Sequence, residues 1–132
     1  MSQPTFPADL KYTTDHEWAR TTGGEITVGV TAFAVEQLGD ITLVNVDAKA
    51  GDTLEAGKAF GTIESVKTLS DLYAPISGKL VRVNPALESK PELVNDDCYG
   101  EGWMVVIAPS DPAAAAALLD AAAYEAHVAS QG

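Results

Sequence analysis

Hydrophobic and polar positions alternate along much of the chain, and this pattern predicts a protein built mainly from short strands. The segment Glu25–Val30 places Ile or Val at every second position and predicts a half-buried strand. A partner strand is expected at His16–Arg20, because the intervening Gly23-Gly24 supplies the residues that a tight hairpin turn needs. From Thr31 to Gly39 the period changes, and a capping threonine with a closing glycine predicts a two-turn helix.

The next strand is expected at Ile41–Val46, with Ile41, Leu43 and Asn45 on one face. Both faces of this segment are rather apolar, so we expect the strand to be covered on both sides. Glycine turns then separate further short strands, expected at residues 53–56, 59–66, 69–74, 79–83 and 103–108. Strands and helices do not alternate regularly, which disfavours a parallel βαβ sheet and favours a small sandwich or barrel.

Helices are predicted mainly in the last third of the chain. Asn84-Pro85 is expected to start a short helix through about Ser89, and residues 91–97 should be irregular or form a single turn. Ser110-Asp111-Pro112 starts a helical tail over residues 111–132, in which Asp120 begins a second helix. The apolar residues available to dock this tail are Leu118, Leu119, Tyr124 and Val128. We expect a single domain at residues 11–132, preceded by a loose lead-in at residues 1–10.

Charge narrows the possible partners. The chain has 132 residues and a net charge of −11, which disfavours nucleic acid and anionic membrane surfaces as partners. One cysteine and two histidines are too few for a disulfide framework, a cysteine-based zinc site or a histidine-rich metal centre. The sequence shows neither a signal-peptide pattern nor an apolar stretch of membrane-spanning length, so we expect a cytoplasmic protein.

The sequence contains no familiar catalytic motif: it has neither a Gly-x-Ser-x-Gly elbow nor a phosphate-binding P-loop. Cys98 follows Asp96-Asp97, whose carboxylates should raise rather than lower the pKa of its thiol, so we interpret it as a plain loop cysteine. His16 is expected to be structural or solvated, and His127 to lie on the surface of the tail helix.

One lysine stands out by its position. Predicted strands run up to Val66 and away from Leu69, which places Lys67 at the tip of a tight hairpin. A lysine in such a turn is usually only a solubilising charge. Here, however, glycine turns at Gly51 and Gly57 before the hairpin and at Gly78 after it form a nearly symmetric frame. This arrangement favours a domain that holds one lysine out for other proteins.

At this point the sequence closely resembles a known family, the H protein of the glycine cleavage system, from Lys11 to about His127. The early marks are Asp15-His16-Glu17-Trp18, Gly29-Val30-Thr31, Glu36-Gln37-Leu38-Gly39-Asp40, Glu64-Ser65-Val66-Lys67, Ser70-Asp71-Leu72-Tyr73 and Pro75-Ile76-Ser77-Gly78. The later marks are Asn84, Pro91-Glu92-Leu93-Val94-Asn95, Tyr99-Gly100-Glu101-Gly102-Trp103 and Pro109-Ser110-Asp111. Two departures are Cys98, where the family often has proline, and Leu69, where it has a smaller residue.

The resemblance implies a barrel-sandwich hybrid of short antiparallel strands, with a short internal helix and a C-terminal helical segment. It also implies that Lys67 carries lipoate as an amide on its ε-nitrogen. Glu64 and Gly78 match the positions that the family uses for recognition by the lipoate-attaching enzyme. The carboxylates Glu17 and Asp71, together with Asp15, match the family's cleft for the aminomethyl-loaded arm, whose ammonium group they would hold.

The implied function is that of a non-catalytic, monomeric carrier. It would take an aminomethyl group from a PLP-dependent glycine decarboxylase to a tetrahydrofolate-dependent aminomethyltransferase, and dihydrolipoamide dehydrogenase would then reoxidise it. Three alternatives stay open. They are an H-like protein that relays lipoate to other enzymes, a lipoyl or biotinyl module of another enzyme, and an interaction module without a cofactor. The residues Val66 and Thr68 beside the lysine disfavour a biotinyl module, which usually has methionines there.

Overall fold

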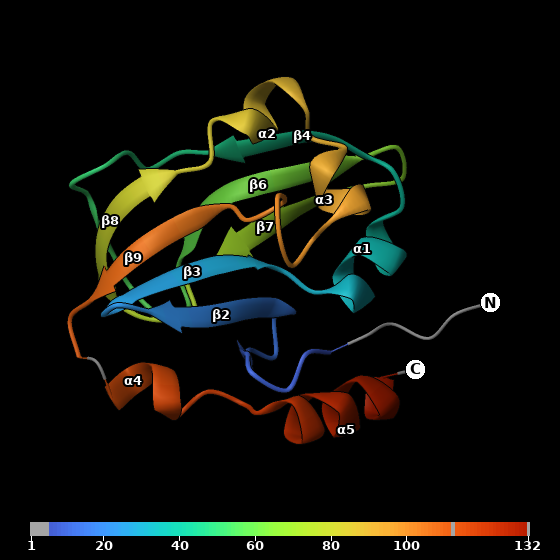
Figure 1. Cartoon of the computed structure of the whole chain (residues 1–132). Helices are drawn as coiled ribbons and strands as arrows, with labels where there is room; N and C mark the ends of the chain where they lie inside the picture. The colour runs from blue at the N-terminus through green and yellow to red at the C-terminus, as the bar shows by residue number, and fades with distance from the viewer. Residues whose placement is uncertain (1–5, 112, 132) are drawn as a thin grey trace.

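The computed structural model describes residues 6–111 and 113–131, and consists of two antiparallel sheets with helices at their edges (Figure 1). The strands are β1 (Lys11–Tyr12), β2 (Glu17–Thr22), β3 (Glu25–Val30), β4 (Ile41–Val46), β5 (Thr53–Leu54), β6 (Ala59–Ser65), β7 (Leu69–Tyr73), β8 (Gly78–Val83) and β9 (Val105–Pro109). The helices are α1 (Ala32–Leu38), α2 (Ala86–Ser89), α3 (Leu93–Asp96), α4 (Ala113–Ala116) and α5 (Ala121–Gln131). Residues 1–5 of the predicted lead-in and Pro112 of the predicted helix start lie outside the described residues.

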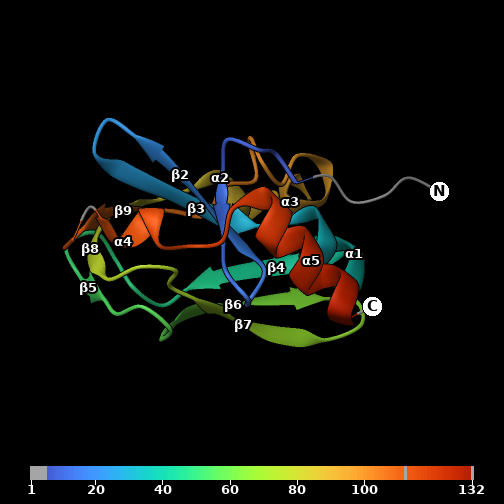
Figure 2. The same ribbon diagram turned by 90° about the horizontal axis from the view of Figure 1, so that it is seen from below.

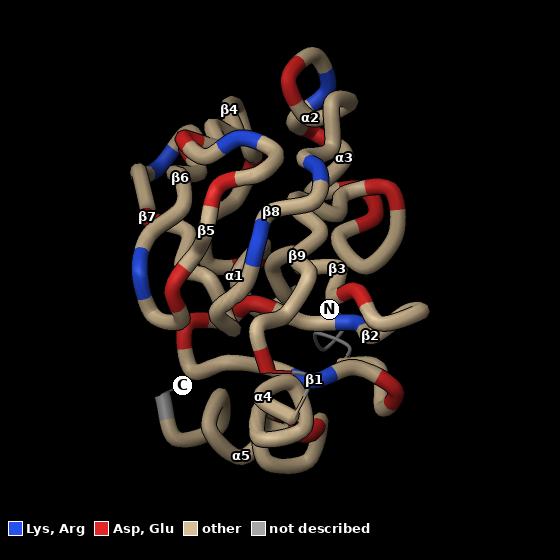
Figure 3. Tube along the Cα trace, turned by 90° about the vertical axis from the view of Figure 1, so that its left-hand side faces the viewer, with Lys and Arg blue, Asp and Glu red and all other residues tan. Residues whose placement is uncertain are grey.

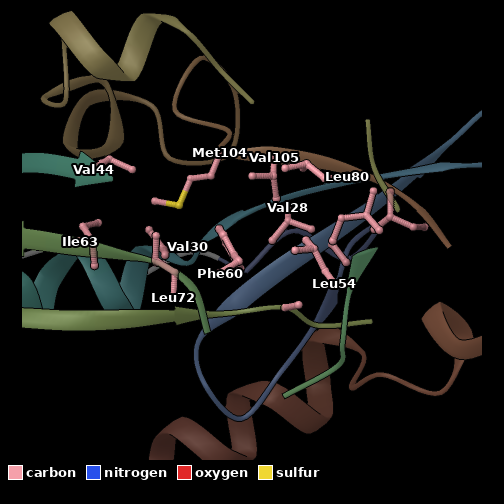
Figure 4. Packing of buried hydrophobic residues seen from close by; sticks show 14 of the residues in the cluster. Val28, Val30, Val44, Leu54, Phe60, Ile63, Leu72, Leu80, Met104 and Val105 are labelled. Carbon is pink, nitrogen blue, oxygen red and sulfur yellow. The ribbon is translucent and has the colours of Figure 1, made fainter. Parts of the chain in front are cut away.

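The two sheets pack face to face and confirm the predicted sandwich. One sheet has six strands in the order β1-β2-β3-β9-β8-β5, and the other has three in the order β4-β6-β7. Side chains from the two inner faces interdigitate between the sheets (Figure 4). Val28 and Leu80 come from the larger sheet, Ile63 and Leu72 from the smaller one, and all four are buried. This core holds the smaller sheet, and with it the β6–β7 hairpin, in place against the larger sheet.

Local capping signals predicted the helix boundaries well. The Thr31 hydroxyl accepts a hydrogen bond from the backbone N–H of Ala34 at 3.2 Å, and Gly39 ends α1 with a φ of +81°. The carboxylate of Asp120 accepts from the N–H of Ala123 at 2.8 Å and starts α5, as predicted. Gly23-Gly24 forms the β2–β3 turn with positive φ at both residues, as expected for a two-residue hairpin.

The prediction for β4 was wrong about its two faces. Ile41 and Val44 are buried, whereas Thr42, Leu43 and Asn45 are exposed. The pairing of β4 with β6 is shifted by a bulge between Ile41 and Leu43, so the side chain of Leu43 points away from the core instead of sharing the face of Ile41. The smaller sheet therefore has one face on the core and one open to solvent.

The end of the predicted lead-in is also part of the core, contrary to expectation. Leu10 is only 1% exposed and packs with Tyr12, Trp18 and Tyr124 in a second hydrophobic cluster. The rings of Tyr12 and Tyr124 stack with their centroids 4.8 Å apart. Helix α5 contacts β1, and in the view from below it lies on the side nearest the viewer (Figure 2). This cluster docks the C-terminal helix against the first strands.

Acidic residues are spread along much of the chain, with far fewer basic ones between them (Figure 3). Within residues 6–111 and 113–131, no helix combines the length and the apolar composition needed to cross a membrane.

Candidate functional site

Lys67 lies in the turn that joins β6 to β7, at the open end of the smaller sheet. The side chain of Ser65 organises this turn, because its oxygen accepts hydrogen bonds from the N–H groups of Lys67 and Thr68, each at 3.2 Å. The backbone N–H of Ser65 donates to the carbonyl of Thr68 at 2.8 Å and closes the turn. The backbone at Lys67 is thus fixed, while its side chain is exposed, as the sequence predicted.

The residues that follow α1, Gly39 and Asp40, also contact the hairpin. The N–H of Val66 donates to the carbonyl of Asp40 at 3.0 Å, which ties the turn to the residues after α1. Gly39 lies directly under the lysine, and a Cβ atom placed on Gly39 would lie 3.1 Å from Cε of Lys67. The glycine that ends α1 therefore also gives the lysine side chain room to lie along the end of the helix.

A cleft of about 350 Å³ lies beside this hairpin, between α1, β7 and the chain entering β2. Its walls combine carboxylates with apolar side chains. They are formed by Asp15, His16, Glu17, Val30, Phe33, Ala34, Gln37, Leu38, Ile63, Ser70, Asp71 and Leu72. The helix α1 and the strand β7 form walls of the cleft. Both also lie next to Lys67, because Gly39 at the end of α1 contacts its side chain and β7 begins two residues after it. The three acids predicted for this cleft therefore line one cavity.

Glu17 is the buried acid of the cleft and is only 1% exposed. One of its carboxylate oxygens accepts from the hydroxyl of Thr13 and the other from the backbone N–H of Tyr73, both at 3.0 Å. Burial raises the pKa of Glu17 to about 8, these two hydrogen bonds oppose the shift, and nearby Asp15 adds to it. Glu17 thus joins β2 to β7 and binds a proton at neutral pH when no cation lies beside it.

Asp15 and Asp71 are exposed at the rim of the cleft. The hydroxyl of Tyr73 donates to Asp71 at 3.4 Å, and the negative charge of Asp71 raises the pKa of the Tyr73 hydroxyl. The cleft therefore has a buried, protonatable acid inside and two solvated carboxylates at its mouth. Such a combination suits a cationic group that enters from solvent.

The two residues predicted for recognition by the lipoate-attaching enzyme lie apart. Glu64 is exposed on β6, three residues before Lys67. Gly78 is buried in the six-stranded sheet, where a Cβ atom would overlap the carbonyl oxygen of Ala108 and the side chain of Ile107. Gly78 therefore allows β8 to approach β9 closely, and any effect on recognition must act through the fold.

Sequence reasoning missed the contacts that hold the cleft walls together. His16 has a φ of +69°, a conformation rare outside glycine, and its Nδ1 lies 2.8 Å from the hydroxyl of Tyr124. The same hydroxyl lies 2.8 Å from Oγ1 of Thr31, the N-cap of α1. Tyr124 therefore connects one cleft wall to the other from α5. The spacing of Phe33 and Gln37, one helical turn apart, is the only local signal that a face of α1 lines a site.

The remaining candidates, His127 and Cys98, do not belong to a metal centre within the part of the chain that the structure describes. His127 is half-buried, with its ring 5.9 Å from that of His16, so it is not simply a surface residue. Cys98 is a free cysteine, and burial together with Asp97 raises the pKa of its thiol to about 11. Among the described residues, no three histidine, cysteine or acidic side chains are grouped so that they could hold a metal ion.

Known proteins resemble this chain over nearly its whole length. The family model described as Glycine cleavage H-protein matches residues 10–131. The chain is 55% identical over 123 residues to the glycine cleavage system H protein of Bacteroides thetaiotaomicron, covering 93% of this chain and 97% of the relative. It is 52% identical over 126 residues to the H protein of an Anaeromyxobacter species, covering 96% and 98%.

A solved structure extends the likeness to three dimensions. The crystal structure of a glycine cleavage system H protein from Mycobacterium marinum matches with a TM-score of 0.85 and 39% identity, covering 94% of this chain and 99% of that one. The family match over nearly the whole chain, the curated relatives and the shared architecture agree. The chain belongs to the glycine cleavage H-protein family.

Proposed function

We propose that this protein is a lipoyl carrier of the glycine cleavage system, with lipoate attached to Nζ of Lys67. The observation that carries the proposal is an exposed lysine at a rigid hairpin tip beside a cleft with three acids. In the part of the chain that the structure describes, Arg82–Glu25 is the only salt bridge, so no carboxylate holds the Lys67 amine in place. An acylating enzyme can therefore reach the amine without breaking an ion pair.

The residues around Lys67 fit an attached arm. Acylation turns the lysine ammonium into a neutral amide, and the space above Gly39 lets the aliphatic stem lie against the end of α1. Lipoate, when bound, supplies a dithiolane that accepts the aminomethyl group of glycine. The cleft walls from Phe33 and Leu38 are apolar, so they can cover the stem of the arm and exclude water.

The acids have different parts in this proposal. Asp15 and Asp71 are solvated at the mouth and attract the ammonium group of the aminomethyl load. Glu17, whose pKa is about 8, releases its proton to solvent at the mouth of the cleft when that ammonium group enters, because a nearby positive charge favours the carboxylate. The buried carboxyl then holds the cation in a water-poor position.

The chemistry itself belongs to the partners in this proposal. A PLP-dependent glycine decarboxylase loads the arm, a tetrahydrofolate-dependent aminomethyltransferase unloads it, and dihydrolipoamide dehydrogenase reoxidises it, all in the cytoplasm. The protein holds the lipoyl arm where each partner can reach it and covers the loaded arm in its cleft between encounters, without catalysis of its own.

Peptide mass spectrometry of protein from lipoate-replete cells tests the proposal directly. We expect a lipoyl group on the peptide that contains Lys67 and none on the peptide that contains Lys58, an exposed lysine in another turn. An unmodified Lys67 under these conditions, or full glycine-cleavage activity in Lys67→Arg, would overturn it. A lipoylated protein that donates lipoate to other enzymes but fails in glycine–bicarbonate exchange with the decarboxylase would instead identify a lipoate relay.

A further inference from the structure

The side chain of Asn95, on α3, binds the chain between α1 and β4. Its Nδ2 donates to the carbonyl of Gly39 at 2.8 Å, and its Oδ1 accepts from the N–H of Ile41 at 2.8 Å. These partners lie 56 and 54 residues before Asn95 in the sequence. Helix α3 therefore lies beside the end of α1 (Figure 1). Asn95 holds both ends of a three-residue segment, residues 39–41, here called the bridging segment.

The amide of Asn95 matches its two partners. A carbonyl oxygen needs a donor and an N–H group needs an acceptor, and an asparagine amide supplies one of each. An ionised aspartate has nearly the same shape, but both of its oxygens are acceptors, so one of them would face the Gly39 carbonyl without a proton between them. Asn95 is half-buried, and a buried polar group that loses its partner costs free energy. The position of the bridging segment thus depends on the amide.

The helix that carries Asn95 is fixed to the core. Val94 is fully buried and packs in the main hydrophobic cluster, against which Leu93 also packs. The N–H of Asp97 donates to the carbonyl of Leu93 at 2.8 Å and closes α3. The backbone that presents Asn95 is therefore anchored on both sides of it, and the amide ties the bridging segment to the core.

The bridging segment contacts the lysine hairpin at each of its three residues. The first, a glycine, lies under the side chain of Lys67. The second accepts, at its carbonyl, from the N–H of Val66 at 3.0 Å. The third pairs with Ser65, whose side chain organises the lysine turn. One side chain on α3 thus reaches the hairpin through three successive contacts.

The same segment follows directly on a wall of the cleft. Gln37 and Leu38, the last two residues of α1, line the cleft, and the bridging segment begins at the next residue. An arm on Nζ of Lys67 starts over Gly39 and passes the end of α1 as it enters the cleft. A shift of the bridging segment would therefore move the mouth of the cleft relative to the point where the arm is attached.

We propose that Asn95 is a positioning residue for the carrier arm. By fixing the bridging segment it holds the Lys67 hairpin and the end of α1 in one arrangement, so that the arm enters the cleft. This inference rests on the proposed function of Lys67. Asn95 is not one of the described residues that line the cleft, and it acts through the backbone of residues 39–41.

Asn84 offers a matched control elsewhere in the fold. Its Nδ2 donates to the carbonyls of Glu101 and Trp103 at 2.9 and 2.7 Å, and its Oδ1 accepts from the N–H of Ala86 at 3.1 Å. It is also the more buried of the two asparagines, at 6% exposed. Replacing its donor should therefore destabilise the protein at least as much, without a direct effect on the bridging segment.

The first test uses the unmodified protein and amide hydrogen exchange measured by NMR. In Asn95→Asp the N–H of Val66 should exchange about tenfold faster than in the wild type, because the loss of a hydrogen bond at a half-buried site favours local opening. Asn84→Asp should lower the melting temperature at least as much and leave the exchange of Val66 unchanged. Faster exchange at Ile41 without any change at Val66, or an equal change at Val66 in both variants, would overturn the proposal.

The wild type provides a measurement that does not depend on how well the variants fold. The N–H groups of Ile41 and Val66 should have protection factors within about twofold of each other, because release of the bridging segment exposes both. A Val66 protection factor about tenfold or more below that of Ile41 would show that the hairpin opens without the bridging segment, and would overturn the positioning role.

The second test uses lipoylated protein that the glycine decarboxylase has loaded and from which it has then been removed. Intact-mass measurements over time follow the loss of the aminomethyl group to water. We expect Asn95→Asp to lose it about fivefold faster than the wild type, because a displaced cleft mouth leaves the arm in water for longer. Asn84→Asp should match the wild type.

Equal rates of loss in Asn95→Asp and the wild type, or equally raised rates in both variants, would overturn the positioning role. Failure of the wild type to accept lipoate would instead refute the proposed function. The exchange measurements on unmodified protein would then still decide whether Asn95 holds the lysine hairpin.

Discussion

Two lysines in tight turns lie at opposite ends of β6, and they differ in their surroundings rather than in the turns themselves. Lys58 precedes the strand and Lys67 follows it, and both side chains are exposed. Each lies by a glycine with a φ of +81°, Gly57 for Lys58 and Gly39 for Lys67. Backbone hydrogen bonds close both turns, such as the 3.0 Å bond from the N–H of Lys58 to the carbonyl of Glu55.

The environments of the two lysines diverge beyond these local features. A Cβ atom on Gly57 would meet nothing within 4 Å, whereas one on Gly39 would contact the side chain of Lys67. The cleft at the Lys67 end contains the buried Glu17 and has exposed leucines beside it, whereas the hollow at the Lys58 end, next to Ala59, is lined by Asp47 and Asp52, neither of which is buried. Turns that expose a lysine therefore occur at both ends of β6, and the neighbours contributed by other strands and by α1 distinguish the proposed carrier lysine, Lys67, from Lys58.

The largest effect should come from moving the lysine by one residue. In Lys67→Thr/Thr68→Lys the amine leaves the turn in a different direction, so we expect lipoylation to slow by about a hundredfold or more, since acyl transfer depends on close positioning. The matched change at the other turn, Lys58→Ala/Ala59→Lys, should leave lipoylation unchanged. Intact-mass measurements over a time course check both, and equal rates in the shifted variant would remove the distinction between the two turns.

The acids at the two ends of β6 should also contribute differently to the pH dependence of the unfolding free energy. The pKa of Glu17 is about 8 in the folded protein, above its ordinary 4.5, so the folded state binds its proton more tightly than the unfolded state does. The stabilisation is fully present below about pH 4.5 and is lost as the pH rises through 8. Glu17→Gln should remove most of this loss, which is about 4 kcal/mol between pH 5 and pH 9 in urea unfolding.

The exposed Glu55 in the Lys58 turn provides the control for that experiment. Glu55→Gln should keep the wild-type change of unfolding free energy with pH. The assignment of Glu17 fails if Glu17→Gln and the wild type lose the same stability between pH 5 and pH 9.

Substitutions of the stacked pair Tyr12 and Tyr124 test whether α5 stabilises the cleft walls near Lys67. Tyr124→Phe removes a buried hydroxyl that contacts both His16 and Thr31, and should lower the free energy of unfolding by about 1.5 kcal/mol. It should also speed amide hydrogen exchange at the start of α1, but not in the Lys58 turn. Tyr12→Phe, which loses one bond to the Pro7 carbonyl, is the control and should leave exchange in α1 unchanged. Equal exchange in the two variants would show that Tyr124 does not connect the cleft walls.

The smallest effect should come from the two glycines. Gly39→Ala and Gly57→Ala each force alanine into a positive φ and should lower the unfolding free energy by about 1 kcal/mol. Only Gly39→Ala adds a methyl group under the lysine, so it alone should shift the NMR signal of the Lys67 Cε methylene and slow lipoylation two- to threefold. Identical Cε signals in both variants would mean that Gly39 does not support the lysine. The two- to threefold figure corresponds to about 0.5 kcal/mol, a small steric shift of a flexible chain.

Local rules predicted those parts of the molecule whose causes are local. Thr31 and Gly39 set the ends of α1, Asp120 started α5, and the hairpin around Lys67 formed where alternation stopped on either side of it. The family resemblance supplied the cleft acids, which then proved to line one cavity.

The errors concern features that depend on partners distant in the sequence. No local sequence pattern predicts the bulge in β4, because the bulge depends on how β4 pairs with β6. The burial of Glu17 depends on the N–H of Tyr73, 56 residues away, and the positive φ of His16 coincides with a contact to Tyr124, 108 residues away. Periodicity says which face of an element is apolar, and it cannot say which polar atom of another element will meet it.

The position of Cys98 has a consequence for the proposed lipoyl arm, which would end in a dithiolane. Thiol–disulfide exchange requires a thiolate, and with a pKa of about 11 roughly one Cys98 thiol in ten thousand is ionised at pH 7. The carbonyl of Cys98 also accepts a hydrogen bond from the indole of Trp18 at 2.9 Å, which holds this residue within the fold. If Lys67 carries lipoate as proposed, Cys98 is therefore a poor nucleophile towards the dithiolane arms of neighbouring copies, and disulfide cross-links between carriers should be rare.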